Sequence, residues 1–536
     1  MLPPPPVRGL FRTDLRARAA YAEGAGIFRI LPGAVCVPRD REDVASLAHW
    51  ASAHRVALVP RGAGSAMGGG NVGDGVIVDL TGLPRRVEVD GPARRARATA
   101  SVSLAELNLA ADGAGLRLPP DPSSGRWATL GGMLSTNAAG ARTVRYGSVR
   151  RWVDAVELVT ADGEITELRR GRAPTGRTLA IERFEADAAP AIRAAADLVR
   201  QRFPQTRKNA SGYALDAWLG TGDLIDLLIG AEGTLGFVTA AEWRLDPLPG
   251  ARAGLRVGLR TLDSLGDAVT ALVAHEPSAV ELLDRTFLEL VGEPGPEAVL
   301  LVEVERSDEP SARAAVKQAA AAVAPFATTV DTGLTQAAAE RLWALRHAAS
   351  PILAGLPETR RSLQVIEDGC VPLARMGEYI RAVRGAAAAR DLAVVIFGHA
   401  GDGHVHVNLL PELARAGWEE AVAGLLEAVT DALVRLGGTP SGEHGDGRLR
   451  AGLLHRIFGD EIVALFARVK LAFDPLGILN PGVILPSAEP PVSRLKVGRG
   501  AIALPDDIAR GLRQIEQCGG YARSRLELAD AAPEGA

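Results

Sequence analysis

Cysteine is scarce in this chain. The 536 residues include three cysteines, Cys36, Cys370 and Cys518, which lie far apart and form no C-x-x-C pair. This excludes a disulfide framework and a four-cysteine iron–sulfur site built from this chain alone. Aromatic residues make up 4% of the chain, and the formal net charge is −4 without a lysine-rich tract. Because single-strand binding depends on aromatic stacking and positive charge, we expect no nucleic-acid partner.

Long apolar runs are also absent. No stretch reaches the roughly 20 apolar residues of a membrane span, and runs such as 224–229 are far too short. The first eight residues lack the apolar run of a signal peptide. We therefore expect a cytoplasmic protein without a transmembrane segment, and leave peripheral association with the inner membrane open.

The length and residue pattern predict a protein of several α+β domains. With 536 residues the chain is too long for one core, and 47% hydrophobic and 23% charged residues are ordinary for a globular protein. Short strands and helices run to residue 239, a boundary follows at Leu245–Pro249, and helices then alternate with strands that favour a large antiparallel sheet. From residue 486 onward the sequence predicts a tail. The expected segments are 1–30, 31–249, 250–450, 451–486 and 487–536.

Glycine-rich segments of the first domain indicate a bound dinucleotide. The predicted strand 56–60 leads into Pro60-Arg-Gly-Ala-Gly-Ser65, where successive N–H groups can converge on a phosphate; a plain tight turn is the alternative. This turn is not a Rossmann fingerprint, because Met67 stands at the third glycine position, and it lacks the lysine of a Walker loop. Two further segments, 129–140 and 232–236, favour one extended ligand over three separate turns.

Histidines and glycines cluster in two segments of the second domain. Gly398–Asn408 carries three of the nine histidines, and 441–447 carries a fourth, His444. Such residues fill a core poorly, because each ring needs a polar partner and each glycine costs backbone entropy. They suit a divalent cation beside a proton acceptor. A predicted strand, 393–397, would deliver His399 at its end, and the glycines that follow would turn the chain so that His406 converges on it.

The chain resembles the FAD-linked oxidoreductases of the vanillyl-alcohol oxidase type. Within them it is similar to the branch of D-lactate dehydrogenase, D-2-hydroxyglutarate dehydrogenase and the glycolate oxidase flavin subunit. The similarity rests on the Pro-Arg-Gly-Ala-Gly-Ser turn, Gly-Gly-(x)3-Thr-Asn-Ala-Ala-Gly, Arg-Tyr-Gly, Gly-Ala-Glu-Gly-Thr-Leu-Gly and Phe-Asp-Pro-Leu-Gly-Ile-Leu-Asn-Pro-Gly, in order from about Phe11 to Leu485. It implies a PCMH-type FAD-binding domain of two α+β subdomains, and an α+β cap domain with a large antiparallel sheet.

The resemblance also implies how FAD is held. The pyrophosphate is expected on residues 61–65, with Glu232 and Asn480 near the flavin or adenine portions. FAD is expected to be non-covalent, because residues 61–71 hold no histidine or cysteine that could tether it. The expected cofactor-binding residues are Arg61, Gly62, Ala63, Gly64, Ser65, Asp121, Gly131, Gly132, Thr136, Asn137, Gly140, Gly147, Glu232, Gly233 and Asn480.

The same resemblance implies a metal site and a base. His399, His406 and Glu443 are the expected ligands, and two imidazoles with one carboxylate suit Zn²⁺ or Mn²⁺; a metal-free cluster of hydrogen-bonded histidines is the alternative. His404 stands where the relatives usually have Asn, and we expect it behind the ligands more than among them. His444 is expected to accept the proton of the substrate hydroxyl while hydride passes to flavin N5. A structural hydrogen bond in a glycine turn is its alternative role.

Substrate binding is assigned to three further residues. Arg346 and Ser350 are four apart on a predicted helix and share a face, and the resemblance implies that they hold the substrate carboxylate. Asn408 matches another substrate contact, while an exposed helical arginine is the alternative for Arg346. Ile366 stands where the 2-hydroxyglutarate enzymes have Lys, so the binding of a second carboxylate is open, with Arg360 or Arg361 as substitutes.

We therefore expect FAD-dependent oxidation of a D-2-hydroxy acid to the 2-oxo acid. The alternatives are an oxidase of another alcohol or sugar, and a flavin subunit that is active only with a separate iron–sulfur partner. Residues 504–523 resemble the opening of a cysteine-rich iron–sulfur module, but the one thiolate of Cys518 cannot ligate a cluster. Electrons are then expected to pass to a separate acceptor: an iron–sulfur subunit, an electron-transfer flavoprotein, a quinone or oxygen. A homodimer is among the assemblies left open.

Overall fold

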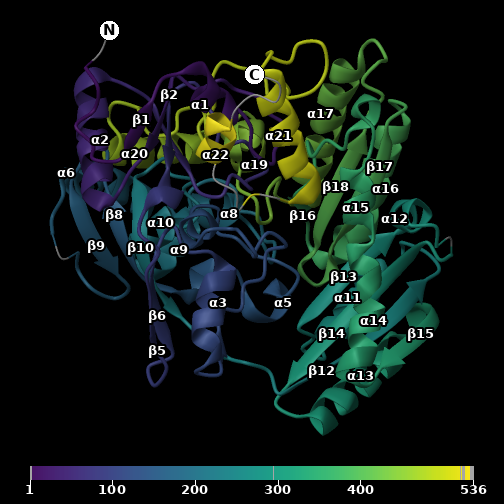
Figure 1. Cartoon of the computed structure of the whole chain (residues 1–536). Coiled ribbons are helices and arrows are strands. Elements are labelled where there is room, and N and C mark those ends of the chain that lie inside the picture. Colours follow the sequence, from purple (N-terminus) through teal and green to yellow (C-terminus); the bar gives the residue numbers. More distant parts are fainter. Residues whose placement is uncertain (1–2, 175, 294, 520, 522–524, 532–536) are drawn as a thin grey trace.

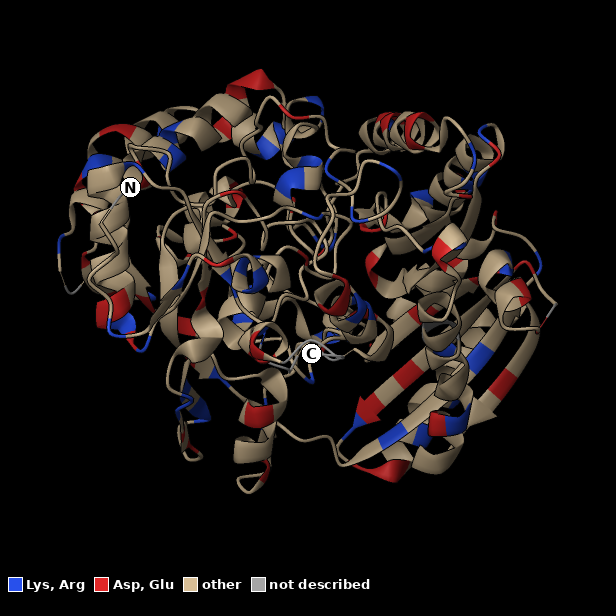
Figure 2. Cartoon of the chain, turned by 45° about the horizontal axis from the view of Figure 1, so that its top comes forward, with Lys and Arg blue, Asp and Glu red and all other residues tan. Residues whose placement is uncertain are grey.

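The protein has two α+β parts that lie side by side (Figure 1). The computed structural model describes residues 3–174, 176–293, 295–519, 521 and 525–531. Basic and acidic residues are interspersed over both parts (Figure 2). Among the described residues, no helix combines the length and the apolarity needed to cross a membrane.

A small sheet near the amino terminus positions the first glycine-rich loop. Its strand order is β1-β2-β4-β3, and both β2 and β3 run parallel to β4. Helix α2 connects β2 to β3; it begins after Asp40, whose side chain accepts a hydrogen bond from the Asp43 N–H, and ends at Arg55 in the left-handed conformation. The elements are β1 (Leu10–Arg12), α1 (Leu15–Ala20), β2 (Ala34–Val37), α2 (Arg41–His54), β3 (Leu58–Arg61) and β4 (Val76–Asp79).

A second, antiparallel sheet completes the first part. Its strand order is β5-β6-β10-β8-β9, and short helices cover it. Residues near the end of the chain also belong to this part: Phe458, Phe466 and Phe473 pack in the same core as Trp243. The strands are β5 (Val87–Asp90), β6 (Arg95–Thr99), β8 (Val153–Val159), β9 (Ile165–Arg169) and β10 (Phe237–Arg244), with the short pair β7 (Leu116–Arg117) and β11 (Asp246–Pro247) beside them. The helices are α3 (Leu104–Asp112), α4 (Leu130–Ser135), α5 (Thr143–Tyr146), α6 (Leu179–Arg183), α7 (Ala189–Ala194), α8 (Ala196–Arg202), α9 (Leu215–Thr221), α10 (Ile225–Leu228), α18 (Gly447–Ala451), α19 (Leu454–Phe458) and α20 (Asp460–Phe473).

The second part is built on a seven-stranded sheet of order β15-β12-β14-β13-β17-β18-β16. Side chains alternate between its faces: Leu282 and Leu300 pack in the large core under α11, α13, α16 and α17, while Leu283 and Leu301 pack with α12 and α15. The strands are β12 (Ala251–Leu259), β13 (Ala279–Asp284), β14 (Ala298–Arg306), β15 (Ala327–Gly333), β16 (Gly369–Cys370), β17 (Ala393–His399) and β18 (His404–Leu410). The helices are α11 (Leu265–Val273), α12 (Arg285–Leu290), α13 (Glu309–Val323), α14 (Gln336–His347), α15 (Ala349–Ala354), α16 (Met376–Ala388) and α17 (Trp418–Leu436). The predicted α+β class with a large antiparallel sheet is confirmed.

The carboxy-terminal segment is folded, whereas the sequence pattern predicted a tail. It carries α21 (Asp506–Cys518) and α22 (Arg525–Asp530), which lie between the amino-terminal helix α1 and the second part of the molecule (Figure 1). Ile508, Leu512 and Ile515 are buried against the first sheet. These residues are four and three apart, which places them on one face of the helix.

Candidate active site

One cavity is lined by residues from both parts of the protein. Its volume is about 490 Å³, within the range of small-molecule and cofactor sites. The glycine-rich loops of the first part line it together with the β17–β18 hairpin and residues 443–444 of the second. The predicted cofactor residues and the predicted metal and substrate residues therefore meet at one site.

The glycine-rich loops pack directly on one another. A Cβ at Gly62 would lie 2.3 Å from Thr129 Oγ1, and a Cβ at Gly233 would lie 2.2 Å from Pro60 Cγ. Gly64 has a φ of 81°, a conformation that favours glycine. Small residues are thus required for the loops to form a continuous wall.

The first loop offers backbone donors to the cavity. Ala63, Gly64 and Ser65 line the cavity, and their backbone N–H groups donate no hydrogen bond to other residues in the described part of the chain. The Arg61 guanidinium donates to the carbonyl oxygens of Glu23, at 2.8 Å, and Asn71, at 3.3 Å. Its side chain therefore holds the loop in shape, and the free N–H groups fit a phosphate.

The other predicted cofactor residues divide into two sets. Arg61, Gly62, Gly131, Gly132, Thr136, Glu232 and Gly233 line the cavity with residues 63–65. Asp121, Asn137, Gly140, Gly147 and Asn480 lie behind this wall and hold its segments together. For example, the Asn480 amide donates to the carbonyl oxygens of Gly70 and Glu232, both at 2.8 Å.

Glu232 joins a flavin-side loop to the turn that carries His444. Its Oε1 accepts hydrogen bonds from the N–H groups of Asp446, at 2.7 Å, and Gly447, at 2.9 Å. Burial and the nearby Asp446 carboxylate raise the pKa of Glu232 to about 8. The first part of the protein is thereby fixed against the turn that carries His444.

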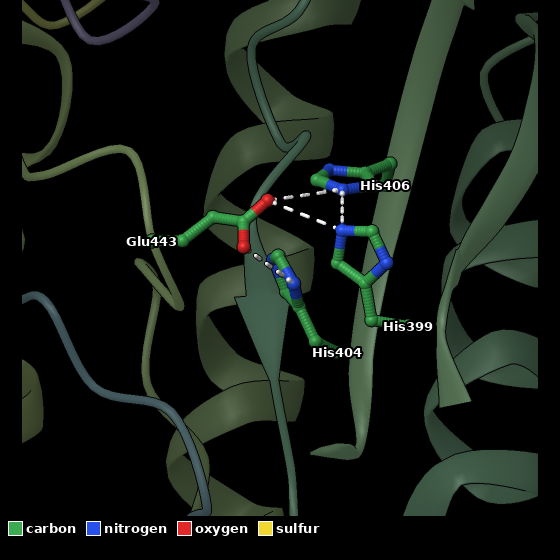
Figure 3. A group of neighbouring side chains, drawn as sticks. All are labelled: His399, His404, His406 and Glu443. Atoms are coloured by element: carbon green, nitrogen blue, oxygen red, sulfur yellow. Dashed lines mark hydrogen bonds and ion pairs between the residues drawn. The ribbon is translucent and has the colours of Figure 1, made fainter. Parts of the chain in front are cut away.

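Two histidines and one carboxylate converge as the metal prediction requires (Figure 3). His399 ends β17 and His406 lies on the antiparallel strand β18. Their Nε2 atoms are 3.2 Å apart, and Glu443 Oε1 lies 3.3 Å from His399 Nε2 and 3.5 Å from His406 Nε2. Ligands at about 2.0–2.1 Å from a tetrahedral Zn²⁺ are about 3.3–3.4 Å apart, so the triangle fits such an ion.

The Nδ1 atoms of His399 and His406, which face away from Glu443, both have a hydrogen-bond partner. His399 Nδ1 lies 2.5 Å from Glu281 Oε1, and His406 Nδ1 donates to the Glu367 carbonyl oxygen at 3.0 Å. These contacts fix the ring orientations and leave both Nε2 atoms facing Glu443, an arrangement typical of metal-ligating histidines.

His404 stands beside the triangle, with its Nδ1 3.9 Å from Glu443 Oε2 (Figure 3). Its Nε2 donates to Asp368 Oδ1 at 2.7 Å, and its Nδ1 lies 3.5 Å from the Lys208 ammonium. Burial and Lys208 lower the pKa of His404 to about 3, so the ring is neutral and Nδ1 accepts. One ligand atom from each of His399, His404, His406 and Glu443 lies within 4.8 Å of the other three. Because the ammonium stands next to Nδ1, this geometry favours a place behind the ligands.

Lys208 is a residue that the sequence prediction missed. Its buried ammonium lies 2.7 Å from Glu443 Oε2, 2.9 Å from the Gly140 carbonyl oxygen and 3.5 Å from Asp402 Oδ2. Burial alone would lower the pKa of Lys208, but the two carboxylates outweigh it and raise the pKa above its ordinary value. Lys208 and Glu443 are 235 residues apart in sequence, so no local pattern marks the contact.

The charged residues around the histidines carry a net negative charge that a divalent cation would neutralise. Carboxylates outnumber fixed cations by two among the residues joined to this cluster by hydrogen bonds and ion pairs. The five carboxylates are Glu281, Glu367, Asp368, Asp402 and Glu443, and the three cations are Lys208, Arg346 and Arg450. A divalent ion would balance this excess with the histidines neutral.

His444 faces the cavity with its ring held from behind. Its Nδ1 lies 2.7 Å from Glu367 Oε2, and the other oxygen of that carboxylate accepts from Arg450 at 2.6 Å. The His444 side chain is 28% exposed, against 7% for His399. Burial lowers the pKa of His444, but Glu367 and Asp368 outweigh it and raise the pKa to about 10. The protonated ring is therefore stabilised by Glu367 at Nδ1, and it must lose a proton before Nε2 can accept one from a substrate.

Two of the three predicted substrate-binding residues, Arg346 and Asn408, lie on the same wall. Arg346 lines the cavity, donates to Glu281 Oε2 at 2.7 Å and lies over the Phe397 ring at 4.5 Å. Asn408 also lines it, and its Oδ1 accepts from Ser362 Oγ at 2.9 Å. Helix α14 ends at His347 and α15 begins at Ala349; Ser350 lies in α15, with its side chain outside the described part of the structure.

Two arginines were candidates for a second carboxylate. Arg361 lines the cavity and pairs with Glu516 of the carboxy-terminal segment. Arg360 is exposed and lies outside that wall. Ile366 is buried in the core of the second part.

Comparisons with known proteins identify both domains that line the cavity. Residues 32–169 match the model of an FAD binding domain, and residues 248–484 match that of the FAD linked oxidases, C-terminal domain. The glycolate oxidase subunit GlcD of Bacillus subtilis (strain 168) is 30% identical over 85% of this chain and 89% of its own length. The D-lactate dehydrogenase of Archaeoglobus fulgidus is 31% identical over 84% of this chain and 91% of its own length. The D-2-hydroxyglutarate dehydrogenase of Pseudomonas putida is 31% identical over 89% of this chain but 50% of its own length.

A solved structure supports the fold. The 4-ethylphenol oxidase from Gulosibacter chungangensis superimposes with a TM-score of 0.65 at 15% identity, over 89% of this chain and 94% of that chain. The two domains and the cavity between them define an FAD-linked oxidoreductase with a PCMH-type FAD-binding domain. The chain belongs to the FAD-linked oxidase family, in the branch that includes proteins named glycolate oxidase subunit, D-lactate dehydrogenase and D-2-hydroxyglutarate dehydrogenase.

Proposed function

We propose that this protein oxidises a D-2-hydroxy acid of the lactate, 2-hydroxyglutarate or glycolate type to the 2-oxo acid. The observation that carries the proposal is the position of His444 beside the triangle of His399, His406 and Glu443, in the cavity that the FAD loops line. A hydroxy acid offers a hydroxyl proton to a base and a carboxylate to a guanidinium, and this wall has both groups.

Arg346 and Asn408 bind the substrate in this proposal, and His444 transfers the proton. Arg346 binds the substrate carboxylate with the guanidinium nitrogens that Glu281 leaves free. Asn408 orients the substrate from the neighbouring strand. His444 accepts the hydroxyl proton at Nε2, while Glu367 holds Nδ1 and stabilises the resulting imidazolium.

The two cofactors supply complementary chemistry. FAD, held by residues 61–65, 131–136 and 232–233, supplies the acceptor for the hydride that leaves C2. A divalent metal, Zn²⁺ or Mn²⁺, held by His399, His406 and Glu443, supplies acidity to the hydroxyl group. The carboxy-terminal segment carries a single cysteine, Cys518, and one thiolate cannot ligate an iron–sulfur cluster. The electrons of the reduced flavin therefore pass to a separate protein or small molecule.

The experiment that tests this function is an anaerobic screen of flavin bleaching. Purified FAD-loaded protein is mixed with D-lactate, D-2-hydroxyglutarate, glycolate, the L-enantiomers, and uncharged alcohols and sugars. We expect at least one of the first three to bleach the flavin. Bleaching by an alcohol or sugar alone would assign the chain to another oxidase class, and no bleaching by the three acids would reject the hydroxy-acid function.

Replacement of His444 by Ala tests the base. We expect FAD to remain bound and the rate of flavin reduction to fall by roughly 10²–10⁴-fold, the usual contribution of a general base. His455→Ala is the matched control, because His455 lies in the short helix α19 outside the cavity wall. An unchanged reduction rate in the His444 variant would remove this residue from the mechanism.

A further inference from the structure

The carboxy-terminal segment contributes to the wall of the cavity although it lies outside both matched domains. The second family match ends at residue 484. Beyond it, Arg513 and Glu516 of α21 and the following Tyr521 line the cavity together with the FAD loops and the histidines. The segment is therefore placed to contact what the cavity holds.

On one side this segment packs against the FAD-binding part. Ile508, Leu512 and Ile515 are buried against Tyr21 and Val59. The Lys496 ammonium donates to the Ala25 carbonyl oxygen at 3.4 Å, and the Ala25 N–H donates to the Gly64 carbonyl oxygen at 2.9 Å. The segment thus reaches the phosphate loop through a single intervening residue.

It also reaches the second glycine-rich region. The ring centroids of Tyr521 and Trp127 are 6.2 Å apart, and both residues line the cavity. A Cβ at Gly519 would lie 2.8 Å from the Trp127 ring. This close approach fixes the end of α21 over the loop that follows residue 121.

On the other side the segment is tied to the cap domain by charge. Glu516 pairs with Arg361 of the cap, with Lys496 at 2.9 Å and with Arg513 at 3.2 Å. Arg513 also donates to Glu358 Oε1 at 2.6 Å. Burial would raise the pKa of Glu516, but Lys496 and Arg361 outweigh it and lower the pKa to about 2. The carboxylate is ionised at any ordinary pH.

We propose that residues 487–519 and 525–531, together with Tyr521, form a cover that retains FAD by joining the cap domain to the FAD-binding domain, with Glu516 as its clasp. Three anchors surround the cavity: Ala25 beside the phosphate loop, Trp127 on the second loop and Arg361 on the cap. With all three in place, the segment blocks the exit of a dinucleotide. Release of FAD then requires the clasp to open.

The test compares two variants of one helix in the FAD-loaded, full-length protein. Glu516→Gln removes the clasp charge and leaves Arg361, Lys496 and Arg513 without their shared carboxylate. Asp507→Asn makes the same chemical change in the first turn of α21, where Asp507 pairs with Arg16 at 2.6 Å outside the cavity wall. The readout is the rate at which the fluorescence of free FAD appears after dilution, with thermal unfolding recorded for each variant.

We expect Glu516→Gln to release FAD about tenfold faster or more, because the buried cations Arg361 and Lys496 lose their shared carboxylate. Asp507→Asn should change the rate less than about twofold, because Asp507 has one partner among the described residues, the half-exposed Arg16, and lies outside the cavity wall. Equal rates in the wild type and the Glu516 variant would overturn the proposal. Equal acceleration in both variants would also overturn it, because it would show general loosening of the helix.

A double variant separates the clasp from local unfolding. If Glu516 acts through Arg361, then Arg361→Gln should accelerate release as much as Glu516→Gln, and the double variant should release FAD no faster than either single variant. Additive acceleration would show that the two residues act independently, and would contradict the clasp.

Discussion

At the scale of single residues, the buried Lys208 ammonium determines how the Glu443 carboxylate is oriented. Lys208 binds Glu443 Oε2, so that Oε1 faces His399 and His406. His404 supports the ammonium from behind through Nδ1. The His404 ring is long enough to contact both Asp368 and Lys208. An Asn side chain at this position is shorter than the ring.

Replacement of Lys208 by Met tests this role. We expect metal affinity to fall by about 10–100-fold, the usual effect of losing a residue that positions a ligand. The measurement is metal content after dialysis, together with a binding titration of Zn²⁺ followed without substrate. Lys317→Met on the exposed face of α13 is the matched control. Equal affinity in the two variants would show that Lys208 does not position Glu443.

The residues predicted from sequence and those missed differ in the kind of contact that defines them. His399, His406 and Glu443 lie in glycine-rich segments whose local composition is unusual for a core, so the sequence indicates them directly. Lys208 and Glu367 act through contacts with residues far away in the chain. The Lys208 contact forms only where the two domains meet, the Glu367 contact forms only when the second domain folds, and no spacing or periodicity marks either.

At the scale of elements, the β17–β18 hairpin brings His399 and His406 together. Phe397 pairs with His406 across the ladder, and the turn between the strands contains Gly403 with a φ of 76°. A Cβ at Gly403 would lie 2.0 Å from the Val371 carbonyl oxygen. The turn therefore requires glycine for its conformation and for its space.

Substitution of this glycine is expected to be costly. Gly403→Ala should destabilise the protein by at least about 1 kcal/mol more than Gly437→Ala, because overpacking adds about 1–3 kcal/mol to the conformational cost. Gly437 is the matched control, since it has a φ of 70° and open space around its Cβ position. Chemical denaturation gives the free energies of unfolding. Equal costs would show that the close approach at Gly403 does not constrain the turn.

Local patterns predicted many of the longer elements, but not the short helices between residues 179 and 228, three strands of the large sheet or the last two helices. Helix α2, strand β17 and helix α20 lie where periodicity and turn residues place them. The segment after residue 486 begins with prolines, and this composition concealed the stripe of Ile508, Leu512 and Ile515. That stripe is apolar because it packs on α1 and the first sheet, a surface nearly 500 residues earlier in the chain.

At the scale of the whole molecule, the site exists because both parts of the chain contribute charge to it. Lys208 comes from the first part, and the carboxylates Glu281, Glu367 and Glu443 come from the second. The sequence predicted an FAD-binding domain followed by a second α+β domain, and it placed in them the residues that we expect to hold FAD and a metal. It could not predict the excess of two negative charges, because that number depends on which side chains the domain contact buries together.

This charge balance predicts how metal binding depends on pH. Burial alone would lower the pKa of His399, but Glu281 outweighs it and raises the pKa to about 9. Without a metal the ring is therefore protonated at neutral pH, and a metal must displace that proton. We expect metal affinity to rise with pH up to about 9 and to level off above it, as measured by titration of chelator-treated protein. An affinity independent of pH between about 6 and 9 would contradict this assignment of His399 as a ligand.

The central claim is that one cavity holds FAD, a hydroxy acid and the base His444. Anaerobic stopped-flow bleaching of the flavin by the two enantiomers of one hydroxy acid, each also with deuterium at C2, tests it most directly. We predict that the D-enantiomer bleaches the flavin much faster than the L-enantiomer, and that deuterium slows the bleaching because hydride leaves C2. Bleaching by both enantiomers at equal rates, or by neither, would contradict the account.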